Sequence, residues 1–252
     1  MAGTMAGKAA VVTGAGMGIG RAVALAFAKE GAGVVVADIN ADAAKETVEL
    51  VEKAGGKALF VQCDVTKEEE IKAMVEAAER EFGRLDYACN NAGIHPEVVP
   101  KPFPEIENSL WDLVMEVNLK SVFLCMKQEL SSMEKQGAGA IVNMASMAGL
   151  LSEPGFPVYT ASKHGVVGLT KAAAFEYAKK GIRINAVCPV PVDTPMLAAA
   201  PQEVLDMLKQ LLPMGRVATM EEVAGAVIWL CSDAASYING IGLPIDGGAS
   251  TV

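Results

Sequence analysis

The chain alternates short, almost wholly apolar runs with longer amphipathic stretches, and this rhythm restricts its fold more than any other feature. Typical apolar runs are KAAVVTG (8–14), GVVVADI (33–39) and GAIVNMAS (139–146). A strand that is apolar on both sides is normally covered on both faces, as in a parallel sheet between two layers of helices. The sequence therefore predicts an α/β fold with a doubly wound parallel sheet.

The complete pattern predicts one domain in which strands and helices alternate. Strands are expected at 8–14, 33–39, 57–65, 85–93, 139–146, 182–189 and 241–248. Helices are expected at 20–32, 41–54, 67–82, 110–135, 159–180, 202–212 and 220–232. No Pro- or Ser-rich linker divides residues 1–252, so we expect a single domain. Ligands of such sheets bind at the carboxyl ends of the strands, which makes the irregular segments at about 94–107 and 189–215 the expected substrate loops.

Charge and cysteine content disfavour several classes of function. Thirty acidic and 21 basic residues give a net charge of −9 without a Lys/Arg cluster, which disfavours binding to nucleic acid or an anionic membrane. The five cysteines are scattered without a C-x-x-C pair, and there are two histidines, so we expect reduced thiols, no metal site and a cytoplasmic protein. We expect neither a signal peptide nor a membrane span, because no charged leader or long apolar run is present.

A glycine-rich stretch between the first strand and the first helix indicates a phosphate site. Residues 13–21 have the pattern T-G-x-x-x-G-x-G followed by Arg. Glycines permit a tight turn and let backbone N–H groups approach a pyrophosphate at the N-terminus of a helix. A glycine cluster alone could be a simple connection, but a strand before it and a helix after it are the context that a dinucleotide site requires.

The second strand ends at Asp38, eighteen residues after Gly20. A carboxylate there can accept hydrogen bonds from both hydroxyls of an adenosine ribose, and it would repel a 2′-phosphate. Asp38 alone would equally suit the N-terminus of the next helix, but the glycine stretch favours the ribose. Met17 and Ile39 supply no cation for a 2′-phosphate, so the sequence indicates NAD(H) rather than NADP(H).

Seven motifs in order make the chain similar to the classical short-chain dehydrogenase/reductase (SDR) family over essentially its whole length. They are TGAGMGIG (13–20), CDV (63–65), NNAG (90–93), VNL (117–119), Ser146, YTASK (159–163) and CPVPVDTPM (188–196). The resemblance implies a single Rossmann-type dinucleotide-binding and catalytic domain with a seven-stranded sheet. It also implies a homotetramer built through the helices at 110–135 and 159–180, with a second interface near the C-terminal strand.

The resemblance further implies the residues of the site. The catalytic set would be Asn118, Ser146, Tyr159 and Lys163. The contacts to NAD(H) would come from Gly14, Gly16, Met17, Gly18, Ile19, Gly20, Asp38, Asp64, Val65, Asn91, Tyr159, Lys163, Val192 and Thr194. Lys163 would also bond the nicotinamide ribose, and Asn118 would support a water that connects Lys163 to solvent.

The chemistry of these residue types agrees with hydride transfer, because oxidation of an alcohol needs a group that takes the hydroxyl proton. A free tyrosine is a poor base because its pKa is about 10. Lys163 lies one helical turn from Tyr159 and is expected to lower that pKa. Ser146 can hold the substrate oxygen, although it could also cap a turn. Asn118 interrupts an apolar helix face, and Asn91 could equally close the edge of the sheet.

The expected substrate pocket is apolar and would be lined by Ile94, His95, Met147, Leu150, Leu151, Phe156, Val190, Met196 and Leu197. The family usually has Pro-Gly after the sixth strand, whereas this chain has Pro189-Val190. Glycine tolerates backbone conformations that a β-branched residue resists. We therefore expect Val190 to change the loop path or narrow the pocket, and to affect substrate choice more than cofactor binding.

The expected function is NAD(H)-dependent interconversion of a secondary alcohol and a ketone, with Tyr159 as general acid/base. A neutral small molecule is favoured because the pocket lacks an obvious Arg or Lys, although Lys101 lies on a neighbouring loop. Reduction of a 3-oxoacyl thioester is the alternative within the family, but an acidic carrier protein would need a basic patch that the sequence does not show. A non-catalytic dinucleotide-binding sensor would be expected to lose Tyr159, Lys163 or Ser146, and all three are present.

Overall fold

One parallel sheet of seven strands forms the centre of the molecule in a computed structural model that describes residues 3–96, 100–198 and 202–251. The spatial order of the strands is β3-β2-β1-β4-β5-β6-β7. The strands are β1 (Ala9–Thr13), β2 (Gly33–Asp38), β3 (Lys57–Gln62), β4 (Tyr87–Asn90), β5 (Gly139–Met144), β6 (Ile182–Pro189) and β7 (Gly242–Ile245). The Rossmann-type sheet predicted from the sequence is confirmed.

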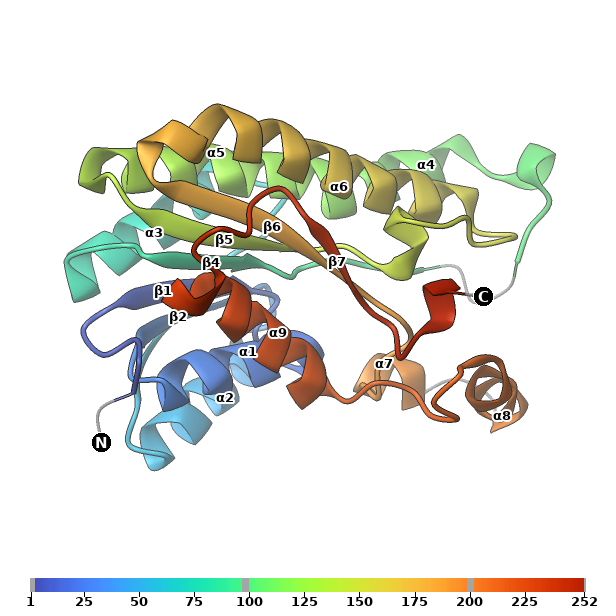
Figure 1. Cartoon of the computed structure of the whole chain (residues 1–252), viewed down its shortest axis with the longest axis horizontal. Coiled ribbons are helices and arrows are strands. Elements are labelled where there is room, and N and C mark those ends of the chain that lie inside the picture. The colour runs from blue at the N-terminus through green and yellow to red at the C-terminus, as the bar shows by residue number, and fades with distance from the viewer. Residues whose placement is uncertain (1–2, 97–99, 199–201, 252) are drawn as a thin grey trace.

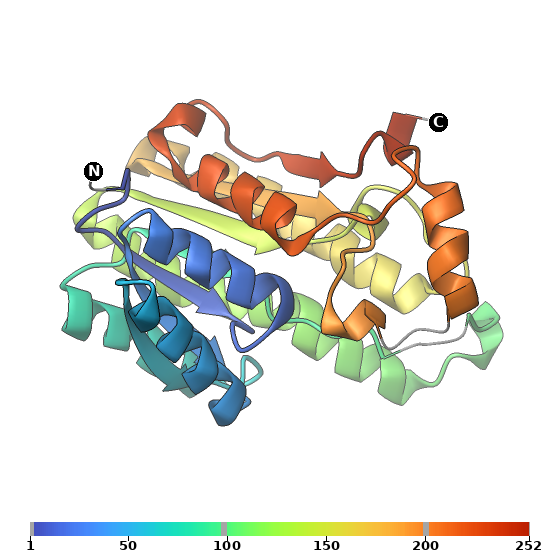
Figure 2. The same ribbon diagram turned by 90° about the horizontal axis from the view of Figure 1, so that it is seen from below.

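Helices cover both faces of this sheet (Figure 1). One face carries α1 (Gly18–Lys29), α2 (Ala41–Lys53) and α9 (Met220–Cys231), which lie in front of the sheet in Figure 2. The other face carries α3 (Glu68–Phe82), α5 (Ser121–Gln136) and α6 (Pro157–Tyr177). The shorter helices α4 (Asn108–Met115), α7 (Pro195–Ala198) and α8 (Gln202–Leu211) lie toward the carboxyl ends of the strands.

Successive side chains of the central strands enter two separate cores. Val11 and Val35 pack with the helices α3, α5 and α6, whereas Val12 and Val36 pack with α1 and α9. All four are fully buried, as the twofold alternation of a strand between two helical layers requires. Each such side chain stabilises the fold by about 1.5–3 kcal/mol relative to an exposed one. The uninterrupted apolar runs of the sequence are thus explained by burial on both sides.

Strands β3 and β7 each end three residues before their predicted ends, and two further elements differ from the sequence prediction. The helix expected at 110–135 begins earlier, at Asn108, and a π-helical turn (Glu116–Lys120) separates α4 from α5. The strand expected at 85–93 is shorter, because β4 ends at Asn90 and the next residue turns toward β1. Both differences lie where candidate site residues are found.

The strand order reverses beside β1, which has β2 on one side and β4 on the other. Connections leave this point toward opposite faces and open a crevice at the carboxyl ends of the two strands. The glycine stretch follows β1 and the NNAG motif spans the end of β4, so the topology brings these motifs to one place. Among the described residues, no helix is both long enough and apolar enough to cross a membrane.

Candidate active site and cofactor cleft

The glycine stretch forms a tight turn between β1 and α1. Gly14 and Gly18 have φ values of 61° and 57°, which other residues rarely adopt. A Cβ at Gly20 would overlap the carbonyl oxygen of Gly14, and one at Gly16 would lie 2.9 Å from Asp38 Oδ2. Helix α1 has no side-chain cap at its N-terminus, so its first N–H groups are oriented for an anion. The turn fits the pyrophosphate of a dinucleotide.

The side chain of Asp38 lies against this turn. Its Oδ2 accepts a hydrogen bond from the Gly16 N–H and its Oδ1 one from the Asn40 N–H, both at 2.8 Å. Each oxygen keeps a second lone pair, so the carboxylate can still accept from a ribose diol. Arg21 was not assigned from the sequence, although a cation directly after the last glycine was the available signal. Its guanidinium donates to the Gly16 carbonyl at 2.6 Å, which stabilises the glycine turn, and it pairs with Glu46 on α2 at 2.7 Å.

Asn91 ties the end of β4 to the end of β1. Its amide donates to the carbonyl oxygens of Thr13 and Gly14 at 3.0 and 3.2 Å. The buried Thr13 hydroxyl oxygen accepts from the backbone N–H groups of Asn91 and Ala92. The sheet-edge role left open for Asn91 is therefore present, and it shapes the glycine turn directly.

The predicted contacts after β3 lie in a turn, because β3 ends at Gln62. Asp64 Oδ1 accepts from both the N–H and the hydroxyl of Thr66, and the Thr66 N–H lowers the pKa of Asp64. Val65 is buried. On the glycine turn, Met17 is half exposed and Ile19 packs partly against the core.

The segment after β6 faces the glycine turn. Val192 is buried and pairs with Ala218 in an isolated bridge. Thr194 Oγ1 accepts from the Leu197 N–H at the start of α7. The Thr194 methyl group is the nearest atom to the place that a Cβ of Gly18 would occupy, at 3.9 Å. The structure thus brings Thr194 beside the glycine turn.

Ser146, Tyr159 and Lys163 come together at the carboxyl end of β5. Lys163 is 5% exposed, and its Nζ donates to the Met144 carbonyl at 3.0 Å. The same Nζ lies 5.6 Å from the centre of the Tyr159 ring. The Ser146 side chain lowers the pKa of Tyr159, and its Oγ accepts from the Ala148 N–H at 3.1 Å. Ser146 therefore caps the turn after β5 and interacts electrostatically with the phenol.

The electrostatics of this cluster differ from the sequence prediction. Burial raises the pKa of Tyr159 to about 12; the hydrogen bond with Ser146 opposes this shift, and Glu153 adds to it. Burial also lowers the pKa of Lys163 to about 8. The pKa of Tyr159 is therefore shifted in the direction opposite to the one expected from the sequence, because loss of hydration dominates and Lys163 is not among the causes of the shift.

Asn118 fixes the loop that follows the NNAG motif. Its Oδ1 accepts from the Ile94 N–H and its Nδ2 donates to the Ile94 carbonyl, both at 2.8 Å. A Cβ at Gly93 would lie 3.2 Å from Asn118 Oδ1 and 3.6 Å from Lys163 Nζ, so the small residue lets these groups approach each other. The π-helical turn places Asn118 for this contact, and such turns are frequent at functional sites.

The predicted substrate residues only partly converge. The His95 ring lies 4.2 Å from the Tyr159 ring and 5.0 Å from the Phe156 ring, centre to centre. Met147 and Leu150 pack partly against the core below α6, whereas Leu151 is half exposed. Ile94 and Leu197 are partly buried. The side chain of Met196 and residues 97–99 and 199–201 lie outside the described part of the structure.

Val190 has an ordinary, hydrogen-bonded backbone conformation. Its N–H donates to the Ile245 carbonyl at 3.2 Å, next to the β6–β7 ladder. In the described part of the chain, positive φ occurs at glycines alone, so Val190 has an ordinary backbone conformation. Its side chain packs against the core on the α1 and α9 side, opposite to Met147 and Leu150.

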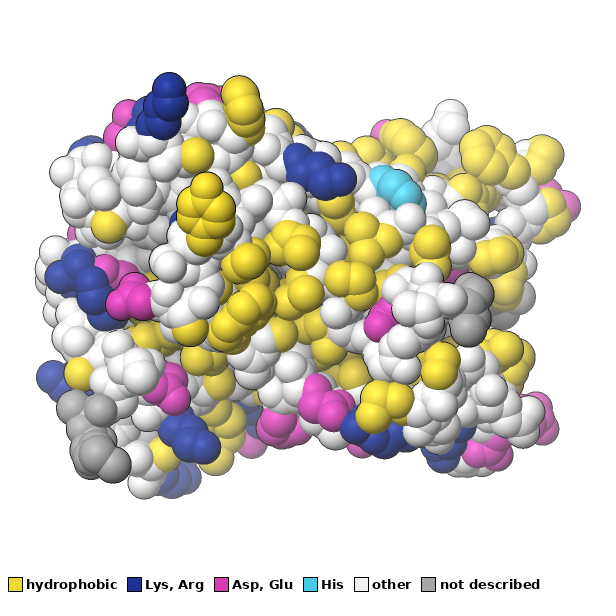
Figure 3. Space-filling view, in the orientation of Figure 1, with side chains coloured by type: hydrophobic (Ala, Val, Ile, Leu, Met, Phe, Trp, Pro, Cys, Tyr) yellow, Lys and Arg dark blue, Asp and Glu magenta, His cyan; other side chains and the backbone are white. Residues whose placement is uncertain are grey.

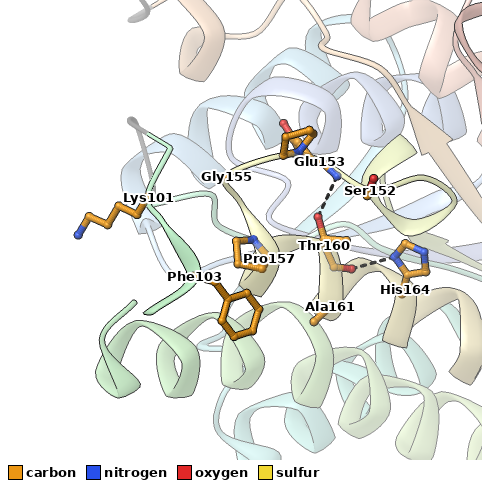
Figure 4. A pocket seen from close by; sticks show the side chains of 10 residues that line it. Lys101, Phe103, Ser152, Glu153, Gly155, Pro157, Thr160, Ala161 and His164 are labelled. Carbon is orange, nitrogen blue, oxygen red and sulfur yellow. Dashed lines mark hydrogen bonds between the residues drawn. The ribbon is translucent and has the colours of Figure 1, made fainter. Parts of the chain in front are cut away.

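A separate cavity of about 530 Å³ lies beside the first turns of α6 (Figure 4). The Thr160 hydroxyl oxygen accepts from the Glu153 N–H, and His164 Nδ1 lies 3.0 Å from the Thr160 carbonyl. Lys101 and Phe103 border it from the loop before α4. The cavity itself was not predicted and none of the individually expected pocket residues lines it, but Lys101 and Phe103 belong to the expected substrate loop at 94–107.

Comparison with known proteins agrees with the geometry. Residues 14–250 match the family model described as enoyl-(acyl carrier protein) reductase. The chain is 47% identical to cyclohexanol dehydrogenase of Acinetobacter sp. (strain SE19), over 95% of this chain and 94% of that protein. The chain belongs to the short-chain dehydrogenase/reductase family. Within the SDR family it is also 43% identical to cis-4-hydroxycyclohexanecarboxylate dehydrogenase of Sinomonas cyclohexanicum, over 97% of both chains.

Solved SDR structures have the same architecture. Levodione reductase superimposes with a TM-score of 0.94 at 35% identity, covering 98% of this chain and 99% of that one. 7 alpha-hydroxysteroid dehydrogenase, complexed with NADH and 7-oxo glycochenodeoxycholic acid, has a TM-score of 0.91 at 36% identity and covers 97% of this chain and 94% of that one. SDR enzymes use nicotinamide dinucleotides, which agrees with the glycine turn and Asp38. Among the described residues, no cluster of three or more His, Cys, Asp or Glu side chains could hold a metal ion.

Proposed function

We propose that the protein is an NAD(H)-dependent dehydrogenase that interconverts a secondary alcohol on a six-membered ring and the corresponding cyclic ketone. The carrying observation is the convergence of Ser146, Tyr159 and Lys163 at the end of β5, where Lys163 Nζ lies 5.6 Å from the phenol ring and Ser146 lowers the pKa of Tyr159. The ring substrate is supported by two relatives that are named as dehydrogenases of cyclohexanol and of cis-4-hydroxycyclohexanecarboxylate. The partly buried rings of His95 and Phe156 provide an apolar surface beside the phenol.

The side chains divide the work in this proposal. Tyr159 takes the hydroxyl proton of the alcohol during oxidation and returns it during reduction. Ser146 donates to the substrate oxygen and stabilises the charge that develops there. Lys163 is held by the Met144 carbonyl and anchors the nicotinamide ribose, and Asn118 keeps the loop at Ile94 beside it. When bound, the nicotinamide supplies the hydride acceptor or donor.

The choice of NAD(H) rests on Asp38. Its carboxylate lies at the end of β2 against the glycine turn, where the adenosine ribose of a dinucleotide binds in this type of sheet. A 2′-phosphate would meet the same negative charge. The nearby cation Arg21 is already occupied by Glu46 and by the Gly16 carbonyl, which supports NAD(H) over NADP(H).

We also propose a homotetramer in the cytoplasm. A groove between the α4–α5 helices and α6 is lined by Met115, Leu119, Phe123, Gly165, Gly168 and Leu169, among others. Hydrophobic side chains also gather over the edge of the sheet at β7, between α6 and α9 (Figure 3). Two separate apolar surfaces on one chain suit an assembly with two kinds of interface. Five buried cysteines without a disulfide suit a reducing compartment.

The proposal is tested by following NADH absorbance with cyclohexanol, cyclohexanone, a linear secondary alcohol and a 3-oxoacyl thioester. We expect the ring substrates to be turned over fastest. Tyr159→Phe should lower kcat by about 10²- to 10⁴-fold, the usual contribution of general acid–base catalysis. Tyr177→Phe on the same helix is the matched control and should leave kcat unchanged. Cofactor binding without turnover of any substrate would support a sensor, and faster turnover of the thioester would support the carrier-linked alternative.

A further inference from the structure

A chain of buried polar side chains connects four elements beneath the proposed site. It consists of Glu129 on α5, Asn90 on β4, Asn143 on β5 and Thr170 on α6, each at most 2% exposed. Asn90 and Asn143 are register partners in the sheet. The proposed reaction uses none of these four residues, which we call the Glu129 network. Buried polar groups of this kind are normally fully hydrogen-bonded, so each atom of the network can be checked for a partner.

The direction of the hydrogen bonds in the Glu129 network follows from its end on α6. The Thr170 hydroxyl donates to the Val166 carbonyl at 2.8 Å, and a carbonyl can only accept. The Thr170 oxygen therefore accepts from Asn143 Nδ2 at 2.9 Å. Asn143 Oδ1 then accepts from Asn90 Nδ2 at 3.0 Å, and this nitrogen also donates to Glu129 Oε2 at 3.0 Å. Both amide orientations are thus determined.

Two oxygen atoms remain without a partner in the described structure, Asn90 Oδ1 and Glu129 Oε1. They belong to the Asn90 amide and the Glu129 carboxyl group, which are already joined by the hydrogen bond from Asn90 Nδ2 to Glu129 Oε2. An amide oxygen and an ionised carboxylate are both acceptors, so neither can satisfy the other. One hydrogen on Glu129 Oε1 would give both orphan atoms a partner and close an acid–amide pair.

The surroundings of Glu129 favour the uncharged form. No ion pair of the described residues includes it, and burial raises its pKa to about 7, against an opposing hydrogen bond from Asn90. The thiols of Cys89 and Cys125 interact with it, and burial keeps both neutral by raising their pKa well above the ordinary value. On the adjacent α3, Glu68 is paired with Lys127 and Glu79 is bonded to the Ser132 hydroxyl, so their charges have other partners.

We propose that Glu129 is a neutral carboxylic acid in the folded protein, that it donates its proton to Asn90 Oδ1, and that it acts as a positioning residue for the site. Asn90 directly precedes Asn91, which shapes the glycine turn. Asn143 directly precedes Met144, whose carbonyl holds Lys163. Thr170 lies two turns beyond Lys163 on α6. Closing the acid–amide pair therefore holds the strand ends that carry both halves of the proposed site.

Glutamine at this position tests the assignment, because its amide imitates the neutral acid. In Glu129→Gln the new NH₂ can donate to Asn90 Oδ1 while the new carbonyl accepts from Asn90 Nδ2. We expect Glu129→Gln to keep kcat and thermal stability within about twofold and a few degrees of wild type. Glu129→Leu, of similar size, should lose at least about tenfold in kcat and melt earlier, since Asn90 Oδ1 loses its proposed donor and Asn90 Nδ2 keeps only the bond to Asn143 Oδ1. Glu134→Gln on the same helix is the control for an exposed glutamate.

Two readouts follow the proton itself and need no substrate. Infrared difference spectra of wild type minus Glu129→Gln should contain the carbonyl band of a protonated carboxylic acid. The folding equilibrium constant of wild type relative to Glu129→Gln should fall about tenfold per pH unit between pH 4.5 and about 7, because only the folded state then keeps the proton, and stay constant above. Absence of the band, a flat pH difference, or a Glu129→Gln variant as impaired as Glu129→Leu would each overturn the proposal. These outcomes are independent of the proposed substrate, so a failure of either proposal can be recognised separately.

Discussion

The charge on Asp38 is the residue-scale feature on which the proposed preference for NAD(H) over NADP(H) depends. Asp38→Asn removes the negative charge and keeps one of the two oxygens that accept from the Gly16 and Asn40 N–H groups. Like charges in contact cost several kcal/mol, so the variant should lower the ratio of kcat/KM for NAD over NADP by about 10- to 100-fold. Steady-state kinetics with both cofactors measure this ratio. Asp42→Asn, on the first turn of α2, is the matched control, and a wild-type preference for NADP would contradict the assignment.

Ser146 should control the pH dependence of the reaction through Tyr159. Oxidation of the alcohol needs the deprotonated phenol, so kcat/KM rises as the pH approaches the pKa of Tyr159. The hydrogen bond from Ser146 lowers that pKa, and Ser146→Ala should therefore move the rising limb of the pH profile to higher pH. A shift of one pH unit lowers the rate on this limb about tenfold at a given pH. Ser152→Ala, on the exposed loop, should leave the limb in place; an unshifted limb in Ser146→Ala would contradict the role.

At this scale the sequence predicts residue types better than their environment. The glycines, Asp38, Ser146, Tyr159 and Lys163 could be found because motif spacing places them on known sides of strands and helices. The direction of the pKa shift of Tyr159 could not be predicted, because burial of its phenol depends on how α6 packs against β5 and on loops that sequence periodicity does not describe. These residues remain predicted site residues whose roles await the variants described.

The π-helical turn between α4 and α5 is the element-scale feature that holds the loop at Ile94. Asn118→Ala would leave the Ile94 N–H and carbonyl without their partners, at about 1–3 kcal/mol for each buried group. We expect a lower Tm together with a fall in kcat that exceeds any change in cofactor affinity. Thermal melts and kinetics on Asn118→Ala and on Asn108→Ala, at the exposed start of α4, measure the difference. A lower Tm with unchanged kcat would show that the turn is only structural.

Strands and helices were predicted close to their observed bounds because apolar runs and amphipathic periodicity report burial directly. The exceptions have local causes. The helical pattern of hydrophobic residues continues across residues 117–123 (VNLKSVF). The extra residue of the π-helical turn therefore leaves no sign in the sequence. The strand ending in NNAG looks longer than β4, because the polar Asn91 side chain turns to the carbonyls of Thr13 and Gly14 and ends the ladder.

For the whole molecule, parallel topology explains how motifs more than a hundred residues apart form one site. The carboxyl ends of all seven strands point to one edge, so the expectation that Asp38, Asn91, Ser146 and Thr194 lie along a common cleft follows from strand order. The cavity bordered by Lys101 and Thr160 could not be predicted, because it depends on how two irregular loops pack beside α6.

The two apolar surfaces make the assembly testable. Phe123 in the groove between the α4–α5 helices and α6 is 50% exposed, and Trp229 on α9, the helix that borders the second surface, is 41% exposed. In an interface with twofold symmetry, each substitution occurs twice and brings new like charges together. We expect Phe123→Glu and Trp229→Glu each to give dimers, and the double variant monomers, in sedimentation velocity experiments. Phe103→Glu, which is 76% exposed but outside both surfaces, should remain tetrameric. If both single variants remain tetrameric, neither surface is an interface. If only one single variant loses the tetramer, only the surface changed in that variant is an interface.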